Sequence, residues 1–228
     1  MVVGIHTNGW AEDRIAPPQV PTIDFVRGLQ HEASIPEVRR LGASIGYVRI
    51  QFFGRRTAAQ LHRILARFQA DGVRAIMIDL RNNEGGYLRS AIQALDCFFS
   101  PGITLLWEVD RDGRRLPYVS KDAEAWTAPV AVLINARSAS SAEAFAASLR
   151  FYRKAFLAGG STFGKGTVQT LSALPSHKRR IATIGLYVLP DGRSIDGIGL
   201  TPDVDVPPGQ DPVAWAAQRL KEAIVPSP

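Results

Sequence analysis

The sequence predicts an α/β protein with a parallel-rich sheet and flanking helices. Short apolar stretches that suit strands alternate with amphipathic helical stretches, a pattern typical of βαβ units. The stretches 75–80 and 129–134 are strongly apolar, which indicates strands covered on both faces. With 228 residues, 46% of them hydrophobic and 21% charged, the chain has the length and composition of one globular domain with a buried core.

The predicted elements follow one another from about residue 42. Residues 45–52 are rich in β-branched and aromatic side chains and predict a strand. Apolar residues at helical spacing predict a helix over 57–68, for which Thr57 is a suitable N-cap. The remaining expected elements are a strand at 75–80, a helix at 87–99, a strand at 128–134, a helix at 142–152, strands at 155–158 and 181–188, and a tail helix at 212–224.

Residues 1–42 form an N-terminal segment that we do not expect to be an independent domain. They contain a proline-rich connector at 15–21 and a candidate strand at 22–26, but too few apolar residues for a core of their own. We therefore expect one domain over 43–228 that ends in the C-terminal helix.

The composition argues against several classes of protein. The single cysteine, Cys97, excludes an internal disulfide and lies in an apolar run, so we expect a buried thiol. The four histidines are scattered, and none stands at ligand spacing from a cysteine or an acid, so we expect no metal site. The net charge is +6, but the arginine pairs are dispersed and are not interleaved with aromatic residues. We therefore expect no nucleic-acid partner.

The sequence also lacks the patterns of membrane and export segments. No apolar run approaches the ~20 residues that a membrane-spanning helix needs, so we expect no integral membrane segment. Residues 1–13 have no basic start followed by an apolar block, as a secretory signal would. We expect either a cytoplasmic protein or a chain whose export signal is missing.

Three polar residues have the types and order of a serine hydrolase site that needs no histidine. Ser140 precedes Lys165 by 25 residues, and Gln169 follows the lysine by 4. Ser140 stands between an apolar strand and a helix, where free helix N–H groups can stabilise an anion. Burial lowers the pKa of a lysine, so that its amine can accept the proton of a serine hydroxyl. If 165–169 is a strand, Gln169 shares a face with Lys165 and can hold the amine in place.

These segments also have simpler interpretations. A serine of 138–141 can serve only as the helix cap, and Lys165 can be a surface lysine in a glycine turn. The run 159–165 has the spacing of a phosphate-binding loop through its lysine. Gly166, however, stands where that motif needs a Ser or Thr for magnesium, so we do not expect nucleotide binding.

A second turn has features of an anion site. Gly85 and Gly86 follow the buried strand at 75–80 and precede a helix. A glycine pair allows a tight turn with exposed N–H groups, one of which could be an oxyanion donor.

Several blocks, in one order, give the chain a specific resemblance. These blocks are Ile45–Ile50 ("IGYIRI"), Asp79–Gly86 ("DLRNNPGG"), Asn135–Glu143 ("NxxSASASE"), Thr162–Gln169 ("TFGKGxVQ") and two closing blocks at 187–195 and 199–204. With them, the chain from about residue 42 to 208 resembles the catalytic core of the carboxyl-terminal processing, or tail-specific, proteases, which are serine peptidases of family S41. The resemblance implies a ClpP/crotonase-like α/β core.

The resemblance implies a role for each polar residue named above. Ser140 would be the nucleophile, Lys165 the general base and Gln169 the amide that orients the lysine. The N–H of Ser141 and one from the Gly85-Gly86 turn would form the oxyanion hole. The resemblance implies no cofactor, and it implies protein or peptide substrates with accessible C-terminal tails. It also implies a periplasmic or otherwise extracytoplasmic setting, although the sequence itself assigns no compartment.

The chain departs from the family pattern in several places. Such proteases commonly carry a PDZ domain before the core, and residues 1–42 are too few to hold one. We expect a serine endopeptidase that cleaves near the C-termini of protein substrates through a Ser-Lys dyad and an acyl-enzyme. The alternative is a catalytically dormant S41-like binding or scaffolding protein, and an accessory partner or a homo-oligomer stays open. The substitutions are Ser141-Ala142 for the usual Ala-Ser, Lys154 for Arg, Gly160 for an acid and Glu84 for Pro.

Overall fold

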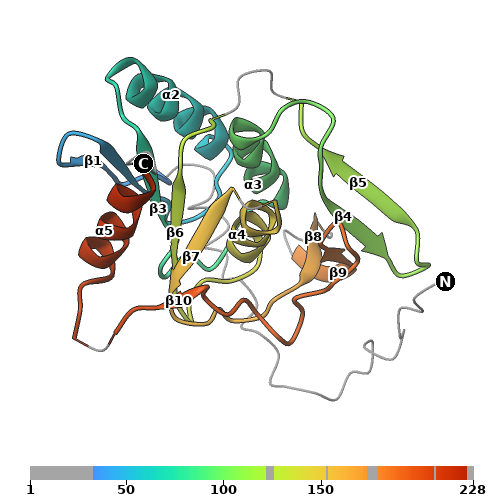
Figure 1. Cartoon of the computed structure of the whole chain (residues 1–228). Coiled ribbons are helices and arrows are strands. Elements are labelled where there is room, and N and C mark those ends of the chain that lie inside the picture. Colours follow the sequence, from blue (N-terminus) through green and yellow to red (C-terminus); the bar gives the residue numbers. More distant parts are fainter. Residues whose placement is uncertain (1–32, 122–125, 153, 174–178, 208, 225–228) are drawn as a thin grey trace.

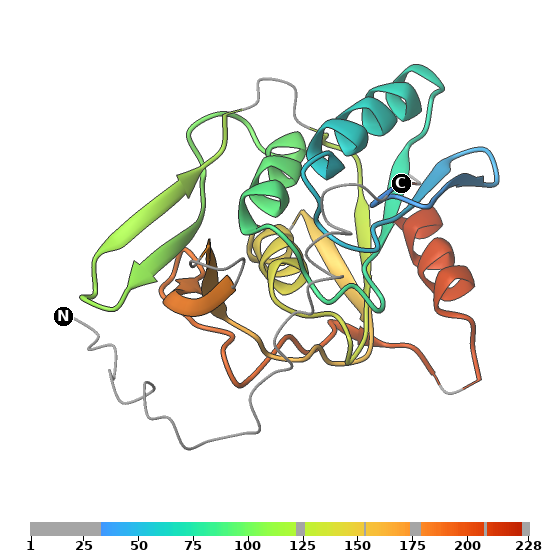
Figure 2. The same ribbon diagram turned by 180° about the vertical axis from the view of Figure 1, so that it is seen from behind.

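The computed structural model of the protein describes residues 33–121, 126–152, 154–173, 179–207 and 209–224. These residues form two β-sheets with helices between them (Figures 1 and 2). The larger sheet has the strand order β1 (Glu37–Leu41), β2 (Ile45–Arg49), β3 (Ala75–Asp79), β6 (Val130–Ile134), β7 (Ala155–Gly159) and β10 (Val204–Asp205). The smaller sheet has the order β5 (Arg115–Val119), β4 (Thr104–Asp110), β9 (Arg179–Val188) and β8 (Thr167–Ala173).

The larger sheet is parallel-rich, which confirms the predicted fold class. The pairs β2–β3, β3–β6, β6–β7 and β7–β10 are parallel, and only the β1–β2 pair is antiparallel. The strand β1 precedes residue 43, so part of the N-terminal segment is hydrogen-bonded into this sheet. The candidate strand at 22–26 lies outside the described residues.

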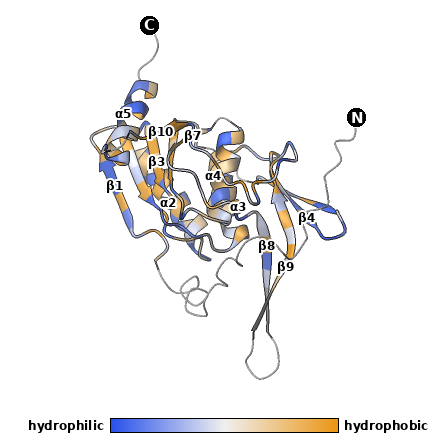
Figure 3. Ribbon diagram, turned by 90° about the horizontal axis from the view of Figure 1, so that it is seen from below, coloured by the Kyte–Doolittle hydropathy of each residue, from blue (hydrophilic) through white to orange (hydrophobic). Residues whose placement is uncertain are grey.

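Alternate residues of the central strands enter two separate cores. In β3, Ile76 and Ile78 pack in the core shared with α2 (Thr57–Ala70), α3 (Leu88–Leu95) and α4 (Ser141–Phe151). Ala75 and Met77 face the opposite way, toward α5 (Pro212–Ile224). All five residues of β3 are buried, as the apolar sequence predicts for a strand covered on both faces. In Figure 3 the central strand β3 is mostly hydrophobic, whereas the edge strand β1 is largely hydrophilic.

The smaller sheet was not foreseen, and its pairing differs from the expected parallel pattern. Its three strand pairs are all antiparallel. Sequence analysis found the strand at 181–188 but missed β4 and β5. The strand β5 in particular is largely exposed and has no clear apolar alternation. An antiparallel sheet can leave one face in water, so its strands lack the continuous apolar runs of the central parallel strands.

Several element boundaries differ from the predictions in informative ways. The predicted helix at 87–99 is α3 followed by a 3₁₀ turn at Asp96–Phe98. Thr57 is not the N-cap of α2, because Arg56 takes that position. The fully buried Thr57 hydroxyl instead accepts a hydrogen bond from the N–H of Gly54 at 2.8 Å. Cys97 is buried, as expected.

Candidate active site

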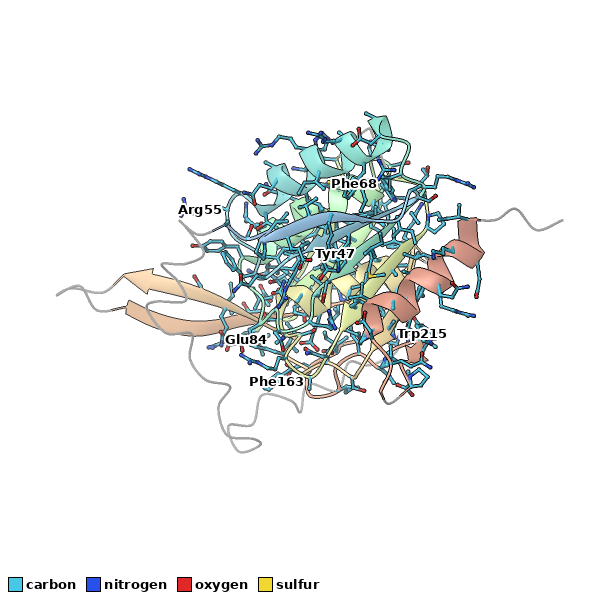
Figure 4. All side chains as sticks on the ribbon, turned by 90° about the vertical axis from the view of Figure 1, so that its left-hand side faces the viewer. Tyr47, Arg55, Phe68, Glu84, Phe163 and Trp215 are labelled. Carbon is cyan, nitrogen blue, oxygen red and sulfur yellow. The ribbon has the colours of Figure 1, made fainter. Side chains whose placement is uncertain are left out.

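Three turns meet at the carboxyl edge of the larger sheet. They follow β3, β6 and β7, which are parallel and therefore end at the same edge. The turn after β3 is joined to the turn after β6 by a hydrogen bond from Asn135 Nδ2 to Asn82 Oδ1 and by one from the Ala139 N–H to the Asn83 carbonyl. The third turn joins them through the Phe163 N–H and the Ser138 carbonyl. Figure 4 shows Glu84 and Phe163, from the first and third turns, at one side of the molecule and away from Phe68 on α2.

Ser140 stands at the N-terminus of α4 in a backbone conformation that is rare for a serine. Its φ is 57° and its ψ is −122°, and Asn82 is the only other described residue besides glycine with a positive φ. Holding such a conformation costs about 1–3 kcal/mol, and strained residues of this kind cluster at functional sites. The side chain is half-buried, at a turn from strand to helix. A residue that served only as a helix cap would not need this strain.

Glu143 is a fully buried carboxylate that holds two of the turns together. Its Oε2 accepts hydrogen bonds from the N–H groups of Ser140 at 2.9 Å and Lys165 at 2.8 Å. Its Oε1 accepts from the Thr162 hydroxyl at 2.5 Å and the Gly164 N–H at 2.7 Å. Burial raises the pKa of the carboxyl, and the donated hydrogen bonds oppose that shift. The carboxylate thus places the backbone of Ser140 beside that of Lys165.

Tyr187 makes a second connection between the same two residues. Its hydroxyl lies 2.9 Å from the carbonyl oxygen of Ser140 and 2.9 Å from that of Lys165. One atom of Glu143 therefore contacts both N–H groups, and one atom of Tyr187 contacts both carbonyl groups. The backbones of Ser140 and Lys165, which are 25 residues apart in the sequence, are neighbours in the fold.

Sequence analysis did not assign a role to Glu143 or Tyr187. For Glu143 a signal was available, since it is the only charged residue in the small and apolar run 138–149. A lone acid in such a run must be buried, and a buried charge needs partners. For Tyr187 no local signal exists, because an aromatic residue in a strand reads as core.

Lys165 carries its amine toward Gln169, as the sequence led us to expect. Its Nζ donates to Gln169 Oε1 at 3.2 Å, and burial lowers the pKa of the amine below its usual value. Ser140 and Lys165 are both among the described residues, and no hydrogen bond joins the serine hydroxyl to the amine in this structure. The strand β8 begins at Thr167, so the condition that 165–169 is one strand holds only for its second part.

The glycines on either side of Lys165 allow a neighbouring loop to approach. A Cβ added at Gly164 would lie 2.9 Å from the nitrogen of Gly199, and one added at Gly166 would lie 2.7 Å from the Cβ of Asp196. The Gly166 N–H donates to Asp196 Oδ1 at 2.8 Å. The loop that contains Asp196 therefore packs directly on the backbone around Lys165. It leaves no room for a side chain at position 164 or 166.

We predict that Gly166→Ala lowers the free energy of unfolding by displacing the backbone next to Lys165, whereas Gly160→Ala leaves it unchanged. The new methyl group of Gly166→Ala would overlap the backbone of Asp196, and such overpacking costs about 1–3 kcal/mol. A Cβ at Gly160, in the same loop, would meet nothing within 4 Å. Urea unfolding of both variants checks the difference. Equal stability of the two variants would contradict the close packing around Lys165.

The same contacts explain why this glycine-rich loop is not a phosphate cradle. A phosphate-binding loop turns its free N–H groups toward the ligand. Here the N–H groups of Gly164 and Lys165 donate to Glu143, and that of Gly166 donates to Asp196. Carboxylates of the protein itself occupy the loop.

The predicted oxyanion donors lie beside Ser140, but they are not equivalent. The Gly85 N–H donates to Asn83 Oδ1 at 2.9 Å, so it is already engaged. Among the described residues, the N–H groups of Gly86 and Ser141 have no hydrogen-bond partner. A Cβ added at Gly85 would lie 2.9 Å from the Cβ of Ser140. Gly85 thus provides space beside the serine, and Gly86 and Ser141 are the available donors.

Other kinds of site are not found at this edge. Within the described ranges, no cluster of three or more His, Cys, Asp or Glu side chains is placed to hold a metal ion. No helix in the described part of the chain is both long and apolar enough to span a membrane.

A cavity of about 730 Å³ lies at the opposite edge of the larger sheet, where it is lined by Val130 and Ala155 at the starts of β6 and β7. None of the predicted site residues lines that cavity.

Comparison with known proteins identifies the family. The family model for peptidase family S41 matches residues 44–206. "Carboxyl-terminal-processing peptidase 3, chloroplastic" of Arabidopsis thaliana is 32% identical over 168 residues, which are 73% of this chain and 32% of that protein. A "Probable CtpA-like serine protease" of Staphylococcus haemolyticus is 34% identical over 190 residues, or 82% of this chain and 38% of that protein.

Solved structures agree with this relationship. The photosystem II D1 C-terminal processing protease matches with a TM-score of 0.66 and 30% identity, over 75% of this chain and 45% of that one. A lipoprotein from Streptococcus agalactiae shares the fold with a TM-score of 0.71 and 23% identity, over 88% and 74% of the two chains. The fold is therefore that of the S41 proteases. The chain belongs to peptidase family S41, the family of the carboxyl-terminal processing proteases. It spans about a third to two-fifths of the length of the curated relatives that it matches.

Proposed function

We propose that the protein is a serine endopeptidase that cleaves near the C-termini of protein substrates through a Ser140–Lys165 dyad. The observation that carries the proposal is the strained Ser140 at the start of α4, with Lys165 held beside it by Glu143 and Tyr187. Family membership supports the serine-type protease class. The proposed preference for C-terminal tails follows the names of the relatives.

In the proposed mechanism, the Ser140 hydroxyl attacks the scissile carbonyl carbon. The neutral Lys165 amine takes the hydroxyl proton as the new C–O bond forms. The N–H groups of Gly86 and Ser141 stabilise the oxyanion, and Ser141 adds the positive end of the α4 dipole. The intermediate collapses when the C–N bond breaks and the Lys165 ammonium protonates the leaving amine. Water, activated by Lys165, then hydrolyses the acyl-enzyme.

The environment of Lys165 suits this role. A lysine in water has a pKa too high to be a base at neutral pH, and burial lowers it. Gln169 accepts a hydrogen bond from the amine and restricts its position. The backbones of Ser140 and Lys165 are already neighbours, so the two side chains start from adjacent positions. Catalytic hydrogen bonds often form fully only when the substrate is bound.

The test is covalent labelling of the full chain with a fluorophosphonate probe, which phosphonylates activated serines. We expect one adduct by intact mass, which peptide mapping places on Ser140. Ser140→Ala should abolish the adduct. Ser161→Ala is the matched control, because Ser161 is exposed in the turn after β7 and has no role in the proposed mechanism, so labelling should continue. An adduct that survives Ser140→Ala would disprove the assignment.

The alternative is a dormant binding or scaffolding protein with the same fold. It is favoured by the absence of a hydrogen bond between the two dyad side chains, both of which the structure describes. A folded wild-type protein that takes no adduct and cleaves no peptide would support this alternative. If the wild-type protein is active, measuring its activity across a range of protein concentrations tests whether a second copy captures the substrate. Adding a candidate accessory partner tests capture by that partner.

A further inference from the structure

Tyr187 connects the second sheet to both residues of the proposed dyad. It lies in β9 of the four-stranded sheet, its side chain is 2% exposed, and it belongs to the main hydrophobic core. Its hydroxyl nevertheless reaches the carbonyl oxygens of Ser140 and Lys165 at the edge of the other sheet. Its backbone N–H also donates to the carbonyl of Gly166 at 3.0 Å. Tyr187 therefore donates hydrogen bonds to two consecutive residues, Lys165 and Gly166.

The two carbonyl groups do not depend equally on this hydroxyl. The Ser140 carbonyl also accepts the helical hydrogen bond from the Ala144 N–H, at 3.0 Å. The Lys165 carbonyl has no other donor among the described residues. A tyrosine hydroxyl has a single hydrogen to share between the two oxygens. Loss of the hydroxyl would thus leave the Ser140 carbonyl hydrogen-bonded within α4 and leave the Lys165 carbonyl without a donor.

The surroundings of Tyr187, first its burial and then the nearby carboxylates, keep it a hydrogen-bond donor. Burial, and then the negative charges of Glu143 and Asp196, raise the pKa of Tyr187 well above its usual value. The Tyr187 hydroxyl contacts the backbone carbonyl of Lys165, and burial moves the pKa of the Lys165 amine in the opposite direction. The lysine therefore titrates while the tyrosine stays protonated, so the hydroxyl can position Lys165 in both of its protonation states.

We propose that Tyr187 is a positioning residue that sets the Lys165 amine against Ser140. The inference rests on the proposed dyad and adds a residue that touches neither the substrate nor the reacting atoms. It makes the four-stranded sheet part of the catalytic apparatus, because the correct placement of the base requires β9 to be docked.

The test is Tyr187→Phe, which keeps the buried ring and removes only the hydroxyl. We expect kcat to fall about 10- to 100-fold, because a small displacement of a catalytic group has an effect of that size. KM for a peptide substrate should stay unchanged, since Tyr187 lies in the core. The inflection of the labelling rate with pH should move upward, because the Lys165 amine becomes better solvated when its backbone loses this hydrogen bond, and its pKa rises.

Tyr118→Phe is the matched control, because the Tyr118 hydroxyl also makes a hydrogen bond in the same sheet, to Glu108, but contacts neither dyad residue. Both variants should lose stability, and only Tyr187→Phe should change kcat and the pH inflection. If Tyr187→Phe had the wild-type kcat and pH inflection, the inference about Tyr187 would be overturned. Labelling of the wild-type protein would still support the dyad in that case. If wild type takes no label, the dyad itself fails.

A measurement on the wild-type protein covers the case in which Tyr187→Phe does not fold. The chain has five tyrosines, so the ¹³Cζ resonance of Tyr187 can be identified by single replacement of the others. It should shift with the same pH inflection as the labelling rate, since its partner carbonyl belongs to the titrating lysine. A resonance that does not respond across that inflection would overturn the inference.

Discussion

Replacing Lys165 with methionine is expected to slow the acylation of Ser140 by a factor of about 10³ to 10⁴. Methionine keeps the length and the apolar stem of the side chain, so the half-buried position stays filled. It has no group that accepts the serine proton, so attack would require an unassisted hydroxyl. The measurement is the rate of fluorophosphonate labelling by intact mass, on protein whose circular dichroism matches wild type.

Two further variants show whether the amine itself is needed. Lys165→Arg keeps the positive charge, but an arginine side chain stays protonated and cannot act as a base, so it should be as slow as Lys165→Met. Lys221→Met makes the same chemical change at an exposed position on α5 and should label at the wild-type rate. A Lys165→Met rate within tenfold of wild type would remove Lys165 from the mechanism.

The same assignment predicts the direction of the pH dependence. Burial lowers the pKa of Lys165 from its usual 10.5, and the neutral amine is the active form. The labelling rate should therefore rise with pH, level off above the lowered pKa, and lose this inflection in Lys165→Met. An inflection that survives in the variant would belong to another group.

Glu143→Gln is expected to lower the free energy of unfolding by about 2–4 kcal/mol and to slow labelling strongly. Every partner of the carboxylate is a donor, three of them backbone N–H groups and one the Thr162 hydroxyl. Glutamine has nearly the same shape, but its amide nitrogen would face two of these donors. Because Glu143 Oε2 holds both Ser140 and Lys165, the loss of stability and the loss of activity should occur together.

Urea unfolding and the labelling rate measure the two effects separately. Glu222→Gln is the control, because it makes the same change at an exposed position on α5. Its free energy of unfolding should stay within about 0.5 kcal/mol of wild type. If Glu143→Gln unfolded and labelled like wild type, Glu143 would not be the residue that joins the two turns.

The predictability of the site varied with the kind of residue. Ser140, Lys165 and Gln169 could be singled out because their types and spacing suit one chemistry, and the structure brings the Lys165 amine to Gln169. The Gly85-Gly86 turn was singled out as a candidate oxyanion turn, but its two glycines could not be distinguished from the sequence. That distinction depends on Asn83, whose side chain engages the N–H of Gly85.

The fold was predictable to a similar degree. The apolar strands and amphipathic helices of the larger sheet were recognised, since burial on both faces imposes continuous apolar runs. The strands β4 and β5 were missed because half-exposed antiparallel strands follow no strong local pattern. Their pairing with β9 brings residues together that are distant in the sequence.

The fold class, the family resemblance and the residues with suitable chemistry could be inferred from the sequence alone, because periodicity, residue type and spacing are local properties. The way in which Ser140 and Lys165 come to lie side by side is a property of the folded chain. Their backbones are held side by side by a buried carboxylate from α4 and a tyrosine hydroxyl from the other sheet. Buried polar groups must find partners wherever the fold supplies them, and local sequence does not specify which distant residue will be within hydrogen-bond reach.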